Sequence, residues 1–133
     1  MRTLIDTNVA IGIANGDRDV AGRVSALGRA PFLSVISRIE LESGVYAEPD
    51  ETEVHRARVD AILGIVEELA FTGNEVAAYA QIVRDRGFSR RLVIDRMIAA
   101  TAMTHDLTLV TMNGADFRSV PGLRLEVWPL SAA

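Results

Sequence analysis

The chain has 133 residues and no cysteine, so it suits one folding unit, residues 1–133, and excludes disulfides and thiolate metal sites. Hydrophobic residues make up 49% and charged residues 24%, which is the balance of a globular protein rather than a disordered or fibrous one. The formal net charge of −4 argues against a protein that holds nucleic acid by bulk attraction alone, and the lack of cysteine suits a reducing cytoplasm.

The first third of the chain is predicted to alternate strands and helices. Residues 2–5 are a short apolar run typical of a buried strand, and Asp6 interrupts it too early for a signal peptide. A helix over residues 9–14 follows, and Asp17 is placed to cap a second helix. Residues 32–36 form the second strand candidate. This is the order of successive β–α units.

Four further helices are predicted in the middle of the chain. Ser37 and Glu40 have the spacing of a capping box at the start of the first of them. Apolar residues then recur at helical spacing over residues 54–69, and a second capping box at 72–75 begins another helix. An arginine-rich connector leads to a largely buried helix over residues 92–104.

Three more strands complete the predicted sheet. They are residues 69–72, residues 108–111 and an edge strand within residues 123–128. Strands that alternate with helices predict an α/β fold with a mostly parallel central sheet, covered on both faces in a doubly wound sandwich. No segment is long and apolar enough to span a membrane.

Four carboxylates occupy the positions where ligands bind in such a sheet. In an open parallel sheet, loops and helix N-termini meet outside the carboxyl ends of the strands. Each acid follows a predicted strand or begins the buried helix, so all four can meet at one edge: Asp6, Glu40, Asp95 and Asp116. Like charges brought together repel, so this group needs bound cations or protons.

The chemistry predicted for this group is metal-assisted cleavage of phosphodiesters. With no cysteine and two histidines in the chain, an all-oxygen set favours Mg²⁺ or Mn²⁺ over zinc, and such ions orient water for in-line displacement at phosphorus. Four polar residues are placed to hydrogen-bond the acids and fix their orientation: Thr7, Asn8, Thr111 and Asn113. Four arginines bracket Gly87 and are candidates for RNA contact through phosphates: Arg84, Arg86, Arg90 and Arg91.

Each acid also has a purely structural interpretation. Asp6 could cap the following helix, although a carboxylate hard against a buried strand is costly unless it is paired. The spacing of Glu40 is fully explained by a capping box, and Asp95 could complement a helix dipole. Asp116 could belong to a turn. Composition and spacing therefore leave the role of these acids open.

Four runs of sequence resemble the PIN-domain family, and their order matches that of the VapC toxins. They are residues 4–8, residues 37–41 with Gly44, residues 95–102, and residues 111–113 with Asp116 and Phe117. The resemblance spans nearly the whole chain, including residues 120–123 before the final strand. Arg96 and Met112 depart from it, because family members commonly carry a small apolar and a basic residue there.

This resemblance implies a PIN-like three-layer α/β/α sandwich and a Mg²⁺- or Mn²⁺-dependent endoribonuclease. It assigns catalysis and metal binding to the family's acidic quartet, here Asp6, Glu40, Asp95 and Asp116. It also implies the toxin role in a toxin–antitoxin pair, with an RNA substrate, a VapB-like antitoxin partner, a homodimer and no membrane.

Two other classes of function remain open. One is a catalytically idle PIN-like module that binds RNA or protein through the same fold. The other is a haloacid dehalogenase-like phosphatase with Asp6 as its nucleophile. That family needs a second aspartate where Asn8 stands, which disfavours the phosphatase.

Overall fold

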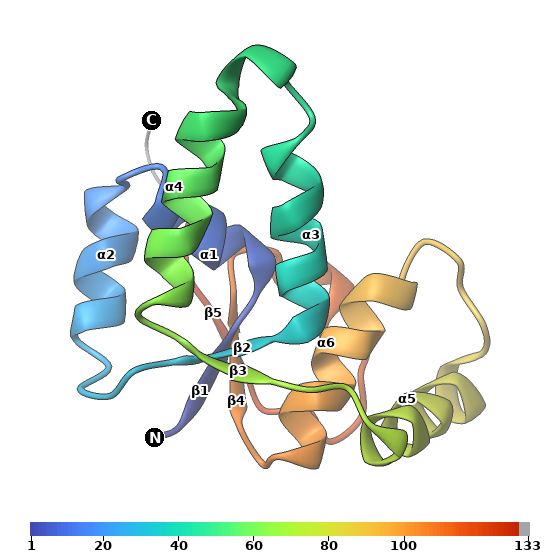
Figure 1. Ribbon diagram of the computed structural model, residues 1–133. Helices are drawn as coiled ribbons and strands as arrows, with labels where there is room; N and C mark the ends of the chain where they lie inside the picture. Colours follow the sequence, from blue (N-terminus) through green and yellow to red (C-terminus); the bar gives the residue numbers. More distant parts are fainter. Residues whose placement is uncertain (131–133) are drawn as a thin grey trace.

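The computed structural model describes residues 1–130, which are built around a five-stranded parallel sheet (Figure 1). The strand order is β3-β2-β1-β4-β5, and every neighbouring pair is parallel. In the central strand, Leu4 pairs with Phe32 on one side and with Leu109 on the other. The strands are β1 (Thr3–Ile5), β2 (Phe32–Ser34), β3 (Glu67–Leu69), β4 (Thr108–Thr111) and β5 (Leu125–Val127). The predicted parallel sheet is confirmed.

Six α-helices and two short 3₁₀ turns join the strands within residues 1–130. The helices are α1 (Thr7–Ala14), α2 (Arg18–Ser25), α3 (Val35–Val45), α4 (Thr52–Leu63), α5 (Gly73–Arg86) and α6 (Val93–Thr104). The 3₁₀ turns are η1 (Pro49–Glu51) and η2 (Gly114–Asp116). In this part of the chain, no helix has the length and apolar character needed to cross a bilayer.

Alternate residues of the strands point into two hydrophobic cores, one on each face of the sheet. Leu4 and Leu109 pack with α5 and α6 on one face, whereas Ile5 packs with α1, α2 and α4 on the other. Figure 1 shows α2 and α4 on one side of the sheet and α5 and α6 on the other. Each of these strand side chains is fully buried, which contributes about 1.5–3 kcal/mol per residue. The three-layer sandwich is confirmed.

Helix α3 begins earlier than its sequence predicts. Its N-cap is Ser34, whose hydroxyl accepts a hydrogen bond from the backbone N–H of Ile36 at 3.1 Å. The helix starts as soon as the pairing of β2 ends, so the second strand stops at Ser34 instead of residue 36. Ser37 and Glu40 therefore lie inside the helix, and the capping box predicted between them does not form. Both side chains are left available for other contacts.

The third strand also differs from its prediction. The helical pattern predicted over residues 54–69 ends at Leu63, and β3 occupies Glu67–Leu69 instead of residues 69–72. Glu67 and Glu68 are exposed at the edge of the sheet, so this strand lacks the apolar pattern of a buried one. Backbone pairing with β2 defines it, and that pairing is not visible in the local sequence.

Other predicted helix ends are confirmed. Asp17 caps α2 through its side chain, and Thr72 and Glu75 form the reciprocal capping box at the start of α5. Gly87, with a φ angle of 80°, ends the same helix in a conformation that favours glycine.

Candidate active site

The four predicted acids meet at one edge of the sheet. Because β1 and β4 are parallel, their carboxyl ends lie at the same edge, and α6 begins there since it leads back into β4. Asp6 follows β1, Asp95 lies in the first turn of α6, and Asp116 lies in η2 beyond β4. Glu40 lies on α3, which follows β2. Besides burial, the negative charges of all three other acids raise the pKa of Asp95.

Asp6 is buried and forms the innermost part of the site. Its side chain accepts hydrogen bonds from the Thr111 hydroxyl at 2.7 Å and from the backbone N–H of Thr7 at 2.8 Å. Burial raises the pKa of Asp6, the two hydrogen bonds oppose this, and the charges of Glu40 and Asp116 add to the rise. Asp6 is also the N-cap of α1, so its structural role coexists with a position suited to a bound cation.

Asp95 is half-buried, and the charges of the other three acids all act on its carboxyl group. Burial and then the neighbouring carboxylates raise its pKa to about 6, while the positive charge of Arg91 acts in the opposite direction. A carboxylate with this pKa is destabilised as an anion by its surroundings. A divalent cation at this edge of the sheet would relieve that repulsion.

Asp116 is held by two donors in the loops above the sheet. Arg91 Nη1 lies 2.9 Å from Asp116 Oδ1, and Asn113 Nδ2 lies 2.8 Å from Asp116 Oδ2. The hydrogen bond from Arg91 and then the one from Asn113 hold the pKa of Asp116 below its ordinary value. Asp116 is therefore an ionised carboxylate at neutral pH, with a cation already beside it.

Glu40 reaches the site from α3 through the side chain of Thr7. The Thr7 hydroxyl donates to Glu40 Oε1 at 2.6 Å and lies 2.8 Å from the Ser37 hydroxyl oxygen. The spacing of Ser37 predicts a helix cap, so this contact with Thr7 is not visible in the local sequence. The earlier start of α3 turns both residues towards α1.

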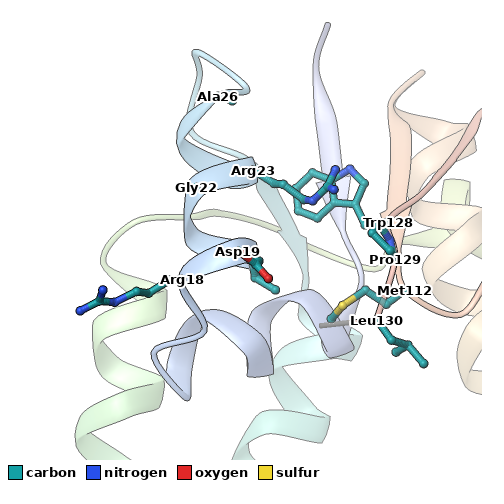
Figure 2. A pocket seen from close by; sticks show the side chains of 10 residues that line it. Arg18, Asp19, Gly22, Arg23, Ala26, Met112, Trp128, Pro129 and Leu130 are labelled. Carbon is teal, nitrogen blue, oxygen red and sulfur yellow. The ribbon is translucent and has the colours of Figure 1, made fainter. Parts of the chain in front are cut away.

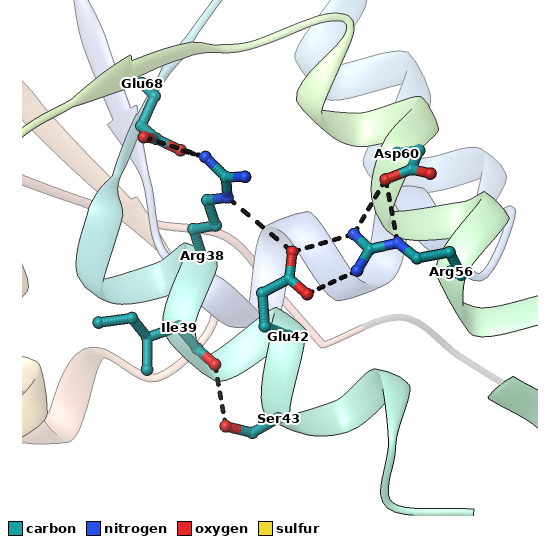
Figure 3. Close-up of polar contacts among 7 residues, drawn as sticks. All are labelled: Arg38, Ile39, Glu42, Ser43, Arg56, Asp60 and Glu68. Atoms are coloured by element: carbon teal, nitrogen blue, oxygen red, sulfur yellow. Dashed lines mark hydrogen bonds and ion pairs between the residues drawn. The ribbon is translucent and has the colours of Figure 1, made fainter. Parts of the chain in front are cut away.

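The neighbouring acid Glu42 takes part in a separate network that ties α3 to α4 (Figure 3). Arg56 binds Glu42 through both terminal nitrogens, at 2.6 and 2.9 Å, and also binds Asp60. Arg38 bonds Glu68 at 3.1 Å and so extends the network to β3. The hydrogen bond from Arg56 lowers the pKa of Glu42. Glu42 is thus engaged in holding the helices together and lies outside the group of four acids.

Thr111 connects the polar residues around Asp6. Its hydroxyl donates to Asp6 and receives hydrogen bonds from Asn8 Nδ2 at 3.3 Å and from the Asn113 backbone N–H at 3.0 Å. Asn8 in turn accepts from the backbone N–H of Met112 at 3.2 Å. Every one of the predicted supporting residues therefore bonds an acid or the Thr111 hydroxyl: Thr7, Asn8, Thr111 and Asn113.

A tighter group of possible metal ligands lies elsewhere. Among residues 1–130, Glu48, Glu51 and His55 form the one set of three histidine or acidic side chains whose ligand atoms all lie within 4.8 Å. This set is on the surface at η1 and α4, where His55 and Glu51 form an ion pair of 3.2 Å. No three of the four acids at the sheet edge bring their ligand atoms this close among residues 1–130, although Asp95 lies near enough to Asp116 for a side-chain hydrogen bond.

The donors at the sheet edge nevertheless fit a hard divalent cation. They are carboxylate, hydroxyl and amide oxygens, and both histidines of the chain lie beside other partners, His55 at Glu51 and His105 at Glu75. Asp6 and Asp95 have raised pKa values, first through burial and then through neighbouring negative charge. Oxygen donors with excess negative charge are the environment that Mg²⁺ and Mn²⁺ prefer.

The arginines around Gly87 differ in their contacts. Arg84 bonds Gln81 on its own helix at 2.9 Å, whereas Arg91 pairs with Asp116. Arg96, which departs from the family pattern, is buried and donates to the backbone carbonyl of Gly87 at 2.7 Å. Its charge is used to hold the α5–α6 connector, residues 87–92, against α6.

A pocket of about 480 Å³ lies apart from the four acids, between α2 and the end of the described chain (Figure 2). Arg18, Arg23, Met112 and Trp128 are among its lining residues, and the Arg23 guanidinium lies 5.9 Å from the centroid of the Trp128 ring. Trp128 is buried directly after β5 and anchors the end of this edge strand in the core.

The parallel sheet and its acidic edge define an α/β/α protein with a candidate metal-dependent hydrolytic site. The sequence model of the PIN domain family matches residues 3–123 of this chain. A protein named Ribonuclease VapC1 from Rickettsia felis is 32% identical over 130 residues, covering 94% of this chain and 95% of the relative. The chain therefore belongs to the PIN domain family, on the branch that the VapC proteins represent.

Further relatives and solved structures agree with this assignment. Ribonuclease VapC from Rickettsia bellii is 26% identical over 135 residues, covering 98% of each chain. DNA-bound VapBC from Salmonella typhimurium has a TM-score of 0.83 at 27% identity, covering 96% of this chain and 98% of the other. VapBC2 from Rickettsia felis, bound to a DNA fragment from its promoter, has a TM-score of 0.85 at 24% identity, covering 96% and 99%. The last of these similarities supports the fold alone.

Proposed function

We propose that this protein is a Mg²⁺- or Mn²⁺-dependent endoribonuclease that acts in the cytoplasm as the toxin of a VapBC-type toxin–antitoxin pair. The observation that carries the proposal is the convergence of Asp6, Glu40, Asp95 and Asp116 at one sheet edge. Relatives that cover almost the whole chain are named ribonucleases. An enzyme that cuts cellular RNA meets its substrate in the cytoplasm.

The four acids would hold the metal, and the polar residues would orient them. When bound, such a metal activates water for attack on phosphorus and stabilises the leaving oxygen. Thr111 and the backbone of Thr7 fix both oxygens of Asp6, while the Thr7 hydroxyl holds Glu40. Asn113 orients Asp116, and Asn8 supports Thr111. These contacts keep the carboxylates in place before the metal arrives, which reduces the reorganisation needed for catalysis.

Phosphate contact by arginines at the end of α5 and in the α5–α6 connector completes the proposed RNA site. Arg84 and Arg86 lie in the last turn of α5, and Arg90 and Arg91 lie in the connector, all with exposed side chains. The connector precedes the first turn of α6, which carries Asp95. Guanidinium groups at this position would bind the RNA backbone without reading its sequence.

We further propose a VapB-like antitoxin and a second copy of this chain as partners. Several large apolar side chains are exposed on α3, its C-cap and α4: Ile39, Tyr46 and Val54. Apolar surface of this kind is typical of proteins that bury it against a partner. The Salmonella structure similar to this chain is a VapBC complex. Light scattering of the purified chain measures the association of two copies, and co-purification with a co-expressed VapB-like antitoxin measures the other association.

The decisive experiment compares Asp6→Asn with Asp50→Asn, a control on the exposed η1 turn. Purified wild-type protein is expected to cut RNA with Mn²⁺ or Mg²⁺ and to stop when EDTA is added. Asp6→Asn should lose at least about a hundredfold of the activity, because even partners of metal ligands are worth up to that much. Asp50→Asn should cut normally.

Two results would reject the nuclease assignment. One is cleavage that continues in EDTA, and the other is full activity of Asp6→Asn. Mn²⁺ binding by calorimetry together with RNA binding but no cleavage would instead favour the catalytically idle binding module. Growth arrest on expression of the wild type, and its absence with Asp6→Asn, tests the toxin role separately.

A further inference from the structure

Arg91 is the one arginine within residues 1–130 that forms an ion pair with a member of the acidic group. Its Nη1 lies 2.9 Å from Asp116 Oδ1, and the other oxygen of Asp116 is held by Asn113. The contact spans two loops, because Arg91 comes from the α5–α6 connector and Asp116 comes from η2. It is therefore a tertiary contact made at the edge of the site.

The positive charge of Arg91 extends beyond its direct partner. The hydrogen bond to Asp116 and the charge of Asp116 raise the pKa of Arg91, and Asp95 adds a smaller contribution. The influence is mutual, because Arg91 acts on Asp95 against the effects of burial and of the other acids. Arg91 thus provides positive charge to two acids of the site.

The exposure of the Arg91 side chain allows it to separate from Asp116. Its side chain is 71% exposed, whereas that of Asp116 is 22% exposed. Ion pairs with one partner this exposed are weak and are easily exchanged. Arg96 in the same region is the opposite case, because it is buried and fixed to a backbone carbonyl.

A guanidinium and a divalent cation cannot share Asp116 without cost. Arginine has no lone pair with which to bind a metal, and its charge repels one. A metal that takes Oδ1 of Asp116 as a ligand competes with Arg91 for the lone pairs of that oxygen and is repelled by the guanidinium charge. The same contact that neutralises Asp116 in the absence of metal therefore opposes metal binding.

We propose that Arg91 is an internal counter-ion of the acidic group, which holds Asp116 in the metal-free protein and competes with the metal for it. The inference rests on the proposed metal site at the sheet edge. Arg91 acts here as a positioning residue and sets the concentration of metal at which the site fills.

Calorimetric titration of Mn²⁺ into the full chain, at fixed pH and ionic strength, tests the competition. Arg91→Gln is expected to bind Mn²⁺ roughly twofold to fivefold more tightly than the wild type, the range that a largely exposed ion pair allows. Arg91→Lys keeps the charge and should stay closer to the wild type. Arg90→Gln is the matched control, because it removes the neighbouring charge, which has no ion pair among the described residues.

A second background separates direct competition from a general effect of charge. With Asp116→Asn in place, Arg91→Gln should change the affinity no more than Arg90→Gln does. Unchanged or weaker Mn²⁺ binding by Arg91→Gln overturns the proposal, as does equal tightening by Arg90→Gln. Either of these results would reject the role of Arg91 alone. The proposed metal site would still stand, provided that the wild type binds Mn²⁺ and Asp6→Asn does not. If the wild type binds no Mn²⁺, both proposals fail.

Discussion

Among residues 1–130, three charged side chains are buried, and they are stabilised to different degrees. Glu75 accepts hydrogen bonds from the backbone N–H and the hydroxyl of Thr72, and Arg96 donates to a carbonyl. Asp6 also has two donors, yet its burial and the neighbouring acids leave its pKa raised. Asp6 is thus the least compensated of the three buried charges, which suits the proposed role of its carboxylate as a ligand of a divalent cation.

The contribution of Glu75 to stability should depend on pH. Burial acts to raise its pKa, but hydrogen bonds from Thr72 outweigh this and leave the pKa below its ordinary value. A carboxyl with a lowered folded-state pKa stabilises the fold above its unfolded pKa, about 4.3, and this contribution is lost as pH falls through the folded value. Glu75→Gln should cost about 1–2 kcal/mol at pH 7 and progressively less below pH 4.

Urea unfolding at several pH values measures this difference. The control is Glu53→Gln, which changes an exposed acid in the first turn of α4. A cost for Glu75→Gln that is the same at pH 3 and pH 7 would show that its charge is not what stabilises α5.

At the level of the secondary structure elements, short connectors position the site as much as helices do. The turn η2 carries Asp116 and packs against β5 through Gly114. A Cβ atom on Gly114 would lie 2.7 Å from Val127 Cγ2 and 2.9 Å from Arg118 Nη2. The close approach of η2 to the edge strand therefore requires glycine at this position, and it sets where Asp116 stands.

Gly114→Ala should destabilise the protein by about 1–3 kcal/mol, because the added methyl group overpacks the contact with β5. Gly22→Ala provides the opposite control, since its Cβ would meet nothing within 4 Å in the middle of α2. That substitution should stabilise by about 0.5–1 kcal/mol through helix propensity. Thermal unfolding of the two variants compares them. Equal effects of the two alanines would contradict the predicted crowding at Gly114.

For the whole molecule, the sheet brings together acids that repel one another. The free energy of folding therefore includes the cost of assembling Asp6, Glu40, Asp95 and Asp116 at one edge, which burial of the two cores must outweigh. A cation that binds the folded chain and not the unfolded chain shifts this balance by mass action.

Mn²⁺ should consequently stabilise the wild-type protein against heat. At about one hundred times its dissociation constant, a ligand contributes roughly 2.7 kcal/mol, which raises the melting temperature of a domain this size by several degrees. Asp95→Asn should lose most of this shift, and EDTA should abolish it in the wild type. A melting temperature of the wild type that does not respond to Mn²⁺ would argue against a metal at these acids.

Much of the fold could be predicted from local sequence. Three kinds of local signal depend on only a few neighbouring residues: the apolar run of β1, the apolar pattern of α6, and the caps Asp17 and Thr72. They can therefore be recognised without tertiary information. The edge strand β3 could not be located in this way, because Glu67 and Glu68 are exposed and its definition comes from pairing with β2. The start of α3 was misplaced for a related reason, since either Ser34 or Ser37 can cap a helix and the end of strand pairing selects Ser34.

By itself, the sequence determined the order of strands and helices, and hence a parallel sheet whose carboxyl edge carries four acids. The tertiary structure alone decided which contacts each acid makes: Thr111 on Asp6, Thr7 on Glu40 and Arg91 on Asp116. These partners are separated from their acids by 105, 33 and 25 residues along the chain. Periodicity and capping rules reach only one or two turns, so contacts over such distances depend on how the layers pack.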